Sequence, residues 1–275
     1  MEMKIMPVKV VGSNKDVETK DELLTKSLRQ SIDEEKSISN FSVIAKKKYY
    51  KDASLKIYKS LEKNFYLDKY GLYRLNGQDD SYIYSNALIG VLSELCSDSK
   101  NSTRVLNLIH EIKMEGGTYP LSLNKDVKNS VSDVTVAILE NLKNNKKESE
   151  RLLALKGYTK KDGLYTSTND QLVIQTFMNS MKGVADSMLG NVEKGKKTLQ
   201  LLSSRIPKTK EGIFYVSNDK KIIMPEAIIS IAMLKLFAES FKAAEEYLKN
   251  LEISLIDSGN VSVLYGIVAA LFSKS

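Results

Sequence analysis

Carboxylate and amide side chains occur at three places inside otherwise apolar segments of this sequence. Asp133, Gln175 and Glu226 each stand in or at the edge of a stretch of helix-forming apolar residues. A polar group in that setting must find a partner or line a wet cavity, because burying it alone is costly. The three residues are therefore candidates for the wall of a ligand site. Asp133 and Glu226 also carry the carboxyl group that acid–base chemistry uses.

Two further acids come directly before predicted apolar helices, namely Asp80 and Asp170. Glycosidic bonds are hydrolysed by two carboxyl groups a few ångströms apart, one protonated and one ionised. Asp80 with Glu226, or Asp133 with Asp170, would form such a pair if the fold brought them together. A competing interpretation of Asp170 is that of a helix cap, because acidic side chains there accept from free backbone amides.

Aromatic and amide side chains supply the candidates for ligand contacts. The chain has 14 tyrosines and no tryptophan, so tyrosine would have to provide any aromatic platform for a sugar. Tyr84, Tyr165 and Tyr215 are the candidates, and core packing is the alternative role for each. Asn129 and Gln175, at or near the starts of predicted helices, complete this set.

Residues that bind metals and cofactors are scarce in the chain. Cys96 is its one cysteine, so neither an internal disulfide nor a cysteine-based zinc site can form. His110, the one histidine, lies on an amphipathic segment and is expected to face solvent or the outer shell. Glycine-rich phosphate loops, nucleophile elbows and His-Glu-x-x-His motifs are missing from the sequence. The sequence therefore predicts neither a metal nor a cofactor.

A short glycine–aromatic phrase recurs along the chain and organises its elements. It reads Gly71-Leu72-Tyr73, Gly117-Thr118-Tyr119, Gly163-Leu164-Tyr165 and Gly212-Ile213-Phe214. The first three glycines are 46 residues apart (117 − 71 and 163 − 117), and the fourth follows after 49 (212 − 163). Self-similarity at such a period predicts an array of equivalent units. Each unit continues with a polar turn, a strongly apolar helix and an amphipathic helix.

The two kinds of helix predict two layers. A helix that is apolar nearly all round must be covered on every side, whereas an amphipathic helix covers something and faces water. The predicted inner helices are residues 81–95, 127–142, 171–189, 222–237 and 261–272. The predicted outer helices are residues 105–112, 146–155, 192–204 and 240–251, and two more helices are expected at 20–36 and 40–65. Glycines on the inner helices, such as Gly90, Gly183 and Gly266, would let neighbouring helices approach closely.

The glycine–aromatic loops resemble those of a known superfamily. Tyr70-Gly71-Leu72-Tyr73-Arg74, Asp162-Gly163-Leu164-Tyr165 and the stretch Glu211 to Val216 are similar to the outer-to-inner loops of α/α-toroid proteins. That superfamily includes the six-hairpin glycosidases and the N-acylglucosamine 2-epimerase group. Over residues 65 to 273, the resemblance implies an all-α, α/α toroid of about five to six helix hairpins, or about eleven helices. It also implies a site at the end of the central cavity where the inner helices begin.

Three functions are compatible with this pattern. The resemblance implies a small carbohydrate-active enzyme, glycosidase-like or epimerase-like, that uses carboxylates at the loop end of the ring. The lack of tryptophan, the single histidine and the lack of a family signature favour a non-catalytic toroid that acts as a ligand-binding or protein-interaction scaffold. In the third, the central cavity holds an apolar ligand such as an isoprenoid or another lipid, and methionines such as Met178 and Met181 line it.

The amino-acid composition limits which partners and which cellular location can be expected. The net charge is +7, but five of the 41 basic residues are arginine, and scattered lysine among glutamate is typical of a solvated helical surface. Nucleic-acid binding is therefore not favoured. The longest apolar run, residues 261–272, is too short to cross a bilayer. We expect a cytoplasmic protein with a polar arm over residues 1–18 and a single domain over residues 19–275.

Overall fold

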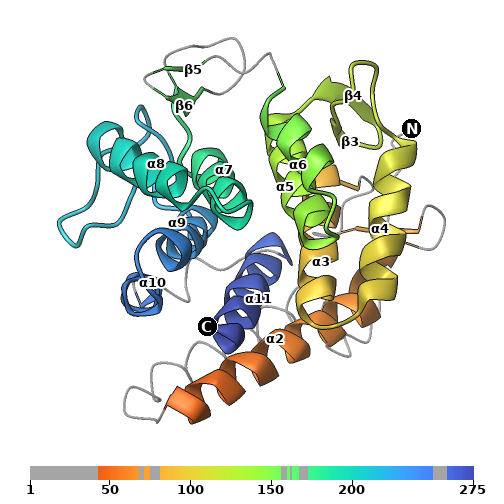
Figure 1. The fold of residues 1–275 in the computed structure, drawn as a ribbon, viewed down its shortest axis with the longest axis horizontal. Coiled ribbons are helices and arrows are strands. Elements are labelled where there is room, and N and C mark those ends of the chain that lie inside the picture. The colour runs from red at the N-terminus through yellow and green to blue at the C-terminus, as the bar shows by residue number, and fades with distance from the viewer. Residues whose placement is uncertain are drawn as a thin grey trace, which may run out of the picture.

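A computed structural model describes residues 43–67, 71–74, 81–155, 160–161, 163–166, 173–249 and 259–275. Ten α-helices and three two-stranded hairpins lie within these ranges. Figure 1 shows how the helices are arranged. The prediction of an all-α fold built from helix hairpins is thereby confirmed. The predicted arm over residues 1–18 and the predicted helix over residues 20–36 lie outside the described residues.

Five helices form the inner layer. They are α3 (Ile83–Leu95), α5 (Ser130–Leu142), α7 (Thr176–Met188), α9 (Pro225–Ala238) and α11 (Gly259–Lys274). Each packs against the next one along the chain, and α11 packs against α3, so the helices close a ring. In α9, all seven residues from 228 to 234 are at most 1% exposed. Such burial requires neighbours on every side, as the apolar sequence of this helix predicts.

The outer layer covers this ring. Helices α4 (Ser99–Glu111), α6 (Lys146–Leu153), α8 (Val192–Arg205) and α10 (Phe241–Leu248) each pack on the inner helix that precedes them. The outer partner of α11 comes from the opposite end of the chain, because α2 (Val43–Phe65) lies along it in Figure 1. The described ring therefore contains five inner–outer pairs, at the lower end of the predicted range.

Glycines at three contacts let the inner helices approach closely. A Cβ atom on Gly90 of α3 would lie 2.7 Å from Leu139 of α5, and one on Gly183 of α7 would lie 2.8 Å from Leu234 of α9. At Gly266 of α11 the added atom would lie 3.0 Å from a side chain of α3. A larger residue at these positions would push the ring apart, because protein cores are close-packed.

Short hairpins precede the inner helices. They pair β1 (Tyr66–Leu67) with β2 (Leu72–Tyr73), β3 (Pro120–Ser122) with β4 (Lys125–Lys128), and β5 (Lys160–Lys161) with β6 (Leu164–Tyr165). The predicted start of the second inner helix at residue 127 was wrong. Residues 125–128 pair as a strand, and α5 begins only after Asn129, whose side chain accepts from the Ser132 backbone N–H.

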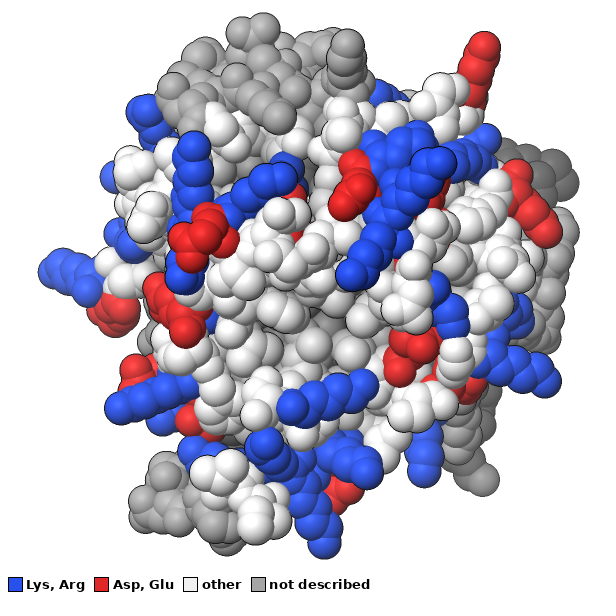
Figure 2. All heavy atoms as spheres, viewed as in Figure 1, with Lys and Arg blue, Asp and Glu red and all other residues white. Residues whose placement is uncertain are grey.

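The distribution of charged side chains on the surface and the lengths of the helices can be compared with the sequence. On the face seen in Figure 2, Lys and Arg side chains are spread around the rim with Asp and Glu among them, while uncharged side chains cover the centre. This distribution matches the solvated lysine surface that the sequence indicates. No described helix combines the length and the apolar composition needed to cross a bilayer.

Candidate functional site

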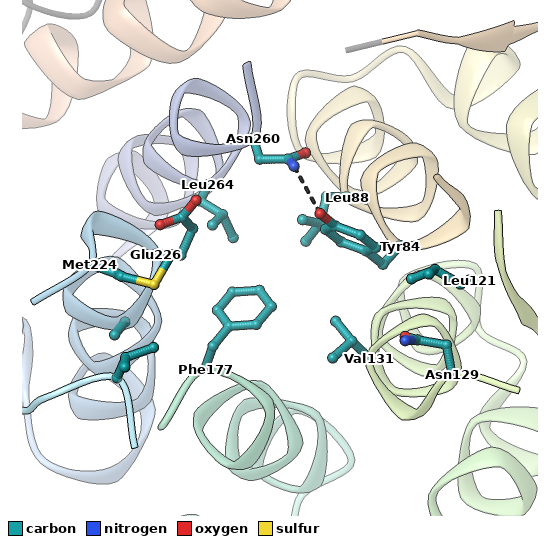
Figure 3. A pocket seen from close by; sticks show the side chains of 12 residues that line it. Tyr84, Leu88, Leu121, Asn129, Val131, Phe177, Met224, Glu226, Asn260 and Leu264 are labelled. Atoms are coloured by element: carbon teal, nitrogen blue, oxygen red, sulfur yellow. Dashed lines mark hydrogen bonds between the residues drawn. The ribbon is translucent and has the colours of Figure 1, made fainter. Parts of the chain in front are cut away.

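A cavity of about 290 Å³ opens where the five inner helices begin. Figure 3 looks down these helices, with the lining side chains pointing into the space between them. The cavity is lined by Tyr84, Leu88, Leu121, Asn129, Val131, Phe177, Val216, Met224, Glu226, Ala227, Asn260 and Leu264. Every inner helix contributes at least one of these side chains, so the cavity depends on closure of the whole ring.

The lining of the cavity differs between its open end, which contains polar side chains, and its floor, which is apolar. Tyr84 and Asn260 lie in the first turns of α3 and α11, and Leu88 and Leu264 follow four residues later on the same helices. Four residues along a helix correspond to about 6 Å. Both leucines are 0% exposed, whereas Met224 near the start of α9 is 39% exposed. The polar lining groups therefore lie at the open end, beside the apolar Val131, Phe177 and Met224, and the deeper lining is apolar.

Tyr84 and Asn260 form the central polar contact of the cavity. The Asn260 Nδ2 donates to the Tyr84 hydroxyl at 3.0 Å, drawn as the dashed line in Figure 3. Asn260 is 8% exposed, and its Oδ1 has no hydrogen-bond partner among the described residues. Burial raises the pKa of the Tyr84 phenol, and the nearby charge of Glu226 raises it further. Tyr84 is therefore a neutral hydroxyl at physiological pH.

Glu226 enters the cavity from the first turn of α9. Pro225 occupies the first helical position, where its missing N–H costs nothing and its fixed φ favours the helix. A carboxylate in this first turn is stabilised by the positive end of the helix dipole. Of the cavity-lining residues, Glu226 is the one with a carboxyl group.

Asp133, by contrast, lies outside the cavity. Its side chain is 0% exposed, and its Oδ1 accepts from the backbone N–H of Tyr119 at 2.8 Å. Tyr119 is the aromatic residue of the second glycine–aromatic phrase, 14 residues earlier in the chain. The buried carboxyl group therefore holds the backbone of this phrase, which explains why an acid occurs inside an apolar helix.

An equivalent contact, in which a side chain of the inner helix binds the backbone of the preceding aromatic residue, recurs in the first and third units. We call this contact the clamp. Asn86 accepts from the Tyr73 N–H at 2.6 Å and donates to the Tyr73 carbonyl at 2.9 Å. Asn179 accepts from the Tyr165 N–H at 2.8 Å and donates to the Tyr165 carbonyl at 2.9 Å. The clamping residue follows its aromatic partner by 13 positions in the first unit and by 14 in the third.

In the fourth unit, the backbone N–H of the aromatic residue has a different hydrogen-bond acceptor. The Phe214 N–H donates to the hydroxyl of Tyr247 on α10 at 3.0 Å, so the clamp comes from an outer helix. The sequence carried a signal for the shared feature, namely a polar residue 13 or 14 positions after each of the first three aromatic residues. That spacing would have identified Asp133 as a member of a structural series.

The other predicted site residues line the cavity, lie elsewhere in the fold or fall outside the described residues. Tyr84, Asn129 and Glu226 line the cavity together. Tyr165 and Tyr215 do not line it. Tyr165 is 5% exposed and its hydroxyl donates to the Leu153 carbonyl at 3.1 Å, while Tyr215 packs against the core.

Gln175, Asp80 and Asp170 complete the predicted set. Gln175 is the residue before α7 and pairs with Ser217 in an isolated bridge, while the cavity contact from this helix is made by Phe177. Asp80 and Asp170 lie outside the described residues, so the predicted carboxylate pairs stay predictions.

Asn260 is the polar cavity residue that the sequence did not predict. The last inner helix was expected to begin at residue 261, but α11 begins at Gly259. Gly259 follows Gly212 by 47 residues (259 − 212), close to the period of the phrase. The glycines of the four phrases lie 12 or 13 residues before their inner helices, whereas Gly259 is the first residue of α11, so this recurrence gave no signal for Asn260.

A second polar cluster lies between α4 and α5, with residues that do not line the cavity. The His110 Nε2 is 2.6 Å from Oε1 of Glu140, which is 1% exposed. The Asn145 Nδ2 donates to the other carboxyl oxygen at 2.9 Å. Among the described residues, no group of three or more His, Cys, Asp and Glu side chains is placed to hold a metal ion.

Comparison with known proteins gives structural likeness alone. No family model and no curated protein matches the chain. The structure of PssZ from Listeria monocytogenes is similar over 77% of this chain and 93% of its own, with 10% identity and a TM-score of 0.47. The structure of a novel alpha-amylase from Clostridium perfringens is similar over 78% of this chain and 96% of its own, with 11% identity and a TM-score of 0.46. Function is therefore inferred from the geometry of the cavity.

Proposed function

We propose that the protein binds a small amphipathic molecule in the cavity at the starts of its inner helices. The observation that carries this proposal is that the polar lining groups lie together at the open end of the cavity, while its deeper lining is apolar. Small-molecule sites are typically apolar, with a few convergent polar groups that fix the orientation of the ligand. The apolar end of the ligand lies against Leu88 and Leu264, and its polar end lies beside Tyr84, Glu226 and Asn260.

The volume of the cavity limits the size of the ligand. Its volume of about 290 Å³ is near the lower end of the roughly 300–1,000 Å³ that is usual for ligand sites. A dry apolar cavity of about 150 Å³ holds one benzene molecule. The cavity therefore has room for a ligand of two to three aromatic rings or a chain of medium length.

Binding is favoured over sugar hydrolysis by the number of carboxyl groups. A glycosidase needs two of them flanking the bond that breaks. Glu226 is the one carboxylate that lines the cavity in the described part of the chain, and Asp133 holds the backbone of Tyr119 instead. A hydrolase would need its second acid from a residue such as Asp80 or Asp170.

A neutral fluorescent probe tests this function. N-phenyl-1-naphthylamine brightens in apolar surroundings, so titration should give a saturable signal with one site per chain. The probe should also raise the melting temperature, because a ligand that binds the native state stabilises it. An absence of saturable binding, both for this probe and for a panel of alcohols and oligosaccharides, would contradict the proposal.

A matched pair of valine variants locates the site. Val131 lines the cavity from the first turn of α5, so V131F should fill it and reduce probe affinity at least tenfold, or about 1.4 kcal/mol. Val127 on β4 is 59% exposed and does not line the cavity. V127F should leave the affinity unchanged. Equal effects of the two variants would place the probe elsewhere.

A further inference from the structure

We propose that the rim of the cavity opening is a docking surface for a membrane that contains anionic lipids. Exposed residues of two chain segments form this surface, which we call the rim surface: Lys125, Val127, Lys220, Lys221, Ile222 and Met224. Docking goes beyond ligand binding and does not depend on it, because Met224 is the one member of this set that also lines the cavity.

The first segment of the rim surface is strand β4. It leads into Asn129, which lines the cavity and has an extended backbone. Successive side chains of an extended chain point to opposite faces, so Val127 and Lys125 lie on the side of Asn129. Both are exposed, and the exposed fraction of Val127 is 59%. The hairpin therefore presents an apolar side chain and a lysine beside the opening.

The second segment lies across the opening, since Figure 3 shows Met224 and Asn129 on opposite sides of the cavity. Ile222 and Met224 are 55% and 39% exposed, whereas Ile223 between them packs against the core. The Ile222 carbonyl accepts from the backbone N–H of Val216, a cavity-lining residue, at 2.8 Å. Ile222 therefore stands at the opening with its side chain in solvent.

The exposed apolar side chains are concentrated at this place. Six large apolar side chains are exposed in the described part of the chain, and three of them belong to the rim surface: Val127, Ile222 and Met224. Single exposed apolar residues are ordinary, but a group of them marks an interaction site with a protein or a membrane.

The charges beside these apolar side chains favour an anionic membrane. Residues 124–128 and 219–224 contain four lysines, two aspartates and no arginine. The carboxylate of Asp219 accepts from the Ser217 hydroxyl at 2.5 Å, while Lys220 and Lys221 are exposed. Lysine lays its aliphatic stem along an apolar surface and keeps its ammonium group in the polar layer. Interfacial membrane binding combines this attraction to anionic lipids with burial of apolar side chains.

Docking would also give the cavity a source of ligand. The opening lies between the two segments, so a docked molecule would turn it toward the lipid layer, where amphipathic molecules concentrate. This step alone rests on the proposed function. Nucleic acid fits the rim surface less well, because arginine is the usual residue for its phosphate and base contacts.

Sedimentation with vesicles tests the docking. The full chain would be mixed, in about 0.1 M salt, with vesicles of phosphatidylcholine or of an equal mixture of phosphatidylcholine and phosphatidylglycerol. We expect binding to the mixed vesicles to be at least about tenfold stronger, because each lysine near an anionic surface adds to the attraction. Equal binding to both kinds of vesicle, or binding to neither, would overturn the proposal.

Two matched lysine pairs distinguish the rim surface from a general attraction of a basic protein. Lys146 and Lys147 are also exposed, but they begin α6 after the end of α5, at the other end of the ring. K220E/K221E and K146E/K147E change the net charge equally. The first should weaken binding to the mixed vesicles at least about tenfold and the second less than about twofold, because distant charges are screened. Equal losses would contradict docking through the rim.

A pair of valine variants tests the apolar contact. Val192 is 37% exposed at the first position of α8, which follows the end of α7. V127S should weaken vesicle binding about threefold or more, because interfacial binding grows with the apolar area buried. V192S should leave it unchanged. Both variants should keep the melting temperature of the natural chain, since surface changes have small effects. Equal binding by V127S and the natural chain would remove Val127 from the contact.

Two further measurements keep the outcomes separate. A dimer in sedimentation velocity that V127S dissociates, together with a lack of vesicle binding, would assign the rim surface to a second copy of the chain and overturn the proposal. K220E/K221E should retain naphthylamine binding in the absence of vesicles, because neither lysine lines the cavity. A natural chain that binds naphthylamine but not vesicles would overturn docking alone, whereas the reverse result would count against the proposed function alone.

Discussion

At the residue scale, buried side chains on the inner helices hold the backbone of the preceding aromatic phrase. Asn86, Asp133 and Asn179 each accept from the N–H group of an aromatic residue 13 or 14 positions earlier. An amide group can serve both the N–H and the carbonyl of its partner, as the two asparagines do. The hairpins that precede the inner helices are thus fixed to the ring by side chains rather than by burial alone.

Replacing Asp133 tests this role. D133N should change the free energy of unfolding by less than about 1 kcal/mol, because asparagine performs the same task in two other units. D133L should cost about 1–3 kcal/mol, because the buried Tyr119 N–H loses its acceptor. Urea denaturation measures both, and naphthylamine binding by the folded variants should be unchanged. Loss of binding in D133N at unchanged stability would return Asp133 to the functional site.

At the element scale, the glycine–aromatic turn connects an outer helix to the next inner one. Gly117 has a φ of +79°, in the left-handed region that favours glycine. Its carbonyl accepts from the Arg151 Nη2 on α6 at 2.7 Å. A similar contact joins Arg104 of α4 to the carbonyl of Gly71. In these two units, an arginine of the outer helix therefore binds the glycine carbonyl of the turn. Asn86 or Asp133 of the inner helix binds the backbone N–H of the aromatic residue that follows.

Two adjacent glycines allow the contact and the backbone conformation to be separated. Gly116 and Gly117 both have positive φ, of +81° and +79°, but a Cβ atom on Gly116 meets nothing within 4 Å, whereas one on Gly117 would lie 2.6 Å from Arg151. G116A should cost about 1–2 kcal/mol of unfolding free energy for the backbone alone. G117A should cost clearly more, because it also displaces the arginine. Equal losses in chemical denaturation would show that the arginine contact contributes little.

At the scale of the whole molecule, the two ends of the described chain close the ring. Phe272 of α11 packs against Tyr50 of α2, with ring centroids 4.9 Å apart, and against Phe241 of α10 at 4.7 Å. The Lys46 Nζ of α2 lies 2.9 Å from Oε1 of Glu245 on α10. The two contacts made by α2 join residues 199 and 222 positions apart (245 − 46 and 272 − 50), so the cavity at the ring centre depends on contacts between the two ends of the described chain.

Phe272→Ala tests whether closure is cooperative. Removing this 0%-exposed ring should cost about 3–5 kcal/mol and lower the melting temperature in a single transition. The control is F177A, because Phe177 is half-buried and lines the cavity. It should weaken naphthylamine binding with a smaller effect on stability. A separate early transition in F272A would indicate that α2 and α11 unfold independently of the ring.

The sequence by itself determined the unit and its two layers. Positive-φ glycines recur at a nearly fixed period, and the contrast between apolar and amphipathic helices distinguishes inner from outer. Both are local properties, since a turn needs its glycine and a buried helix needs apolar residues on every side. The sequence also directed attention to the starts of the inner helices, where Tyr84, Asn129 and Glu226 line the cavity.

Only the tertiary structure decided which polar side chains face the cavity. Asp133 and Glu226 look alike in sequence, as acids within apolar segments, yet one holds the Tyr119 backbone and the other enters the cavity. Asn260 meets Tyr84 across 176 residues, because closure of the ring places α11 beside α3. The direction of a side chain depends on how a helix is rotated against its neighbours, and contacts remote in sequence set that rotation.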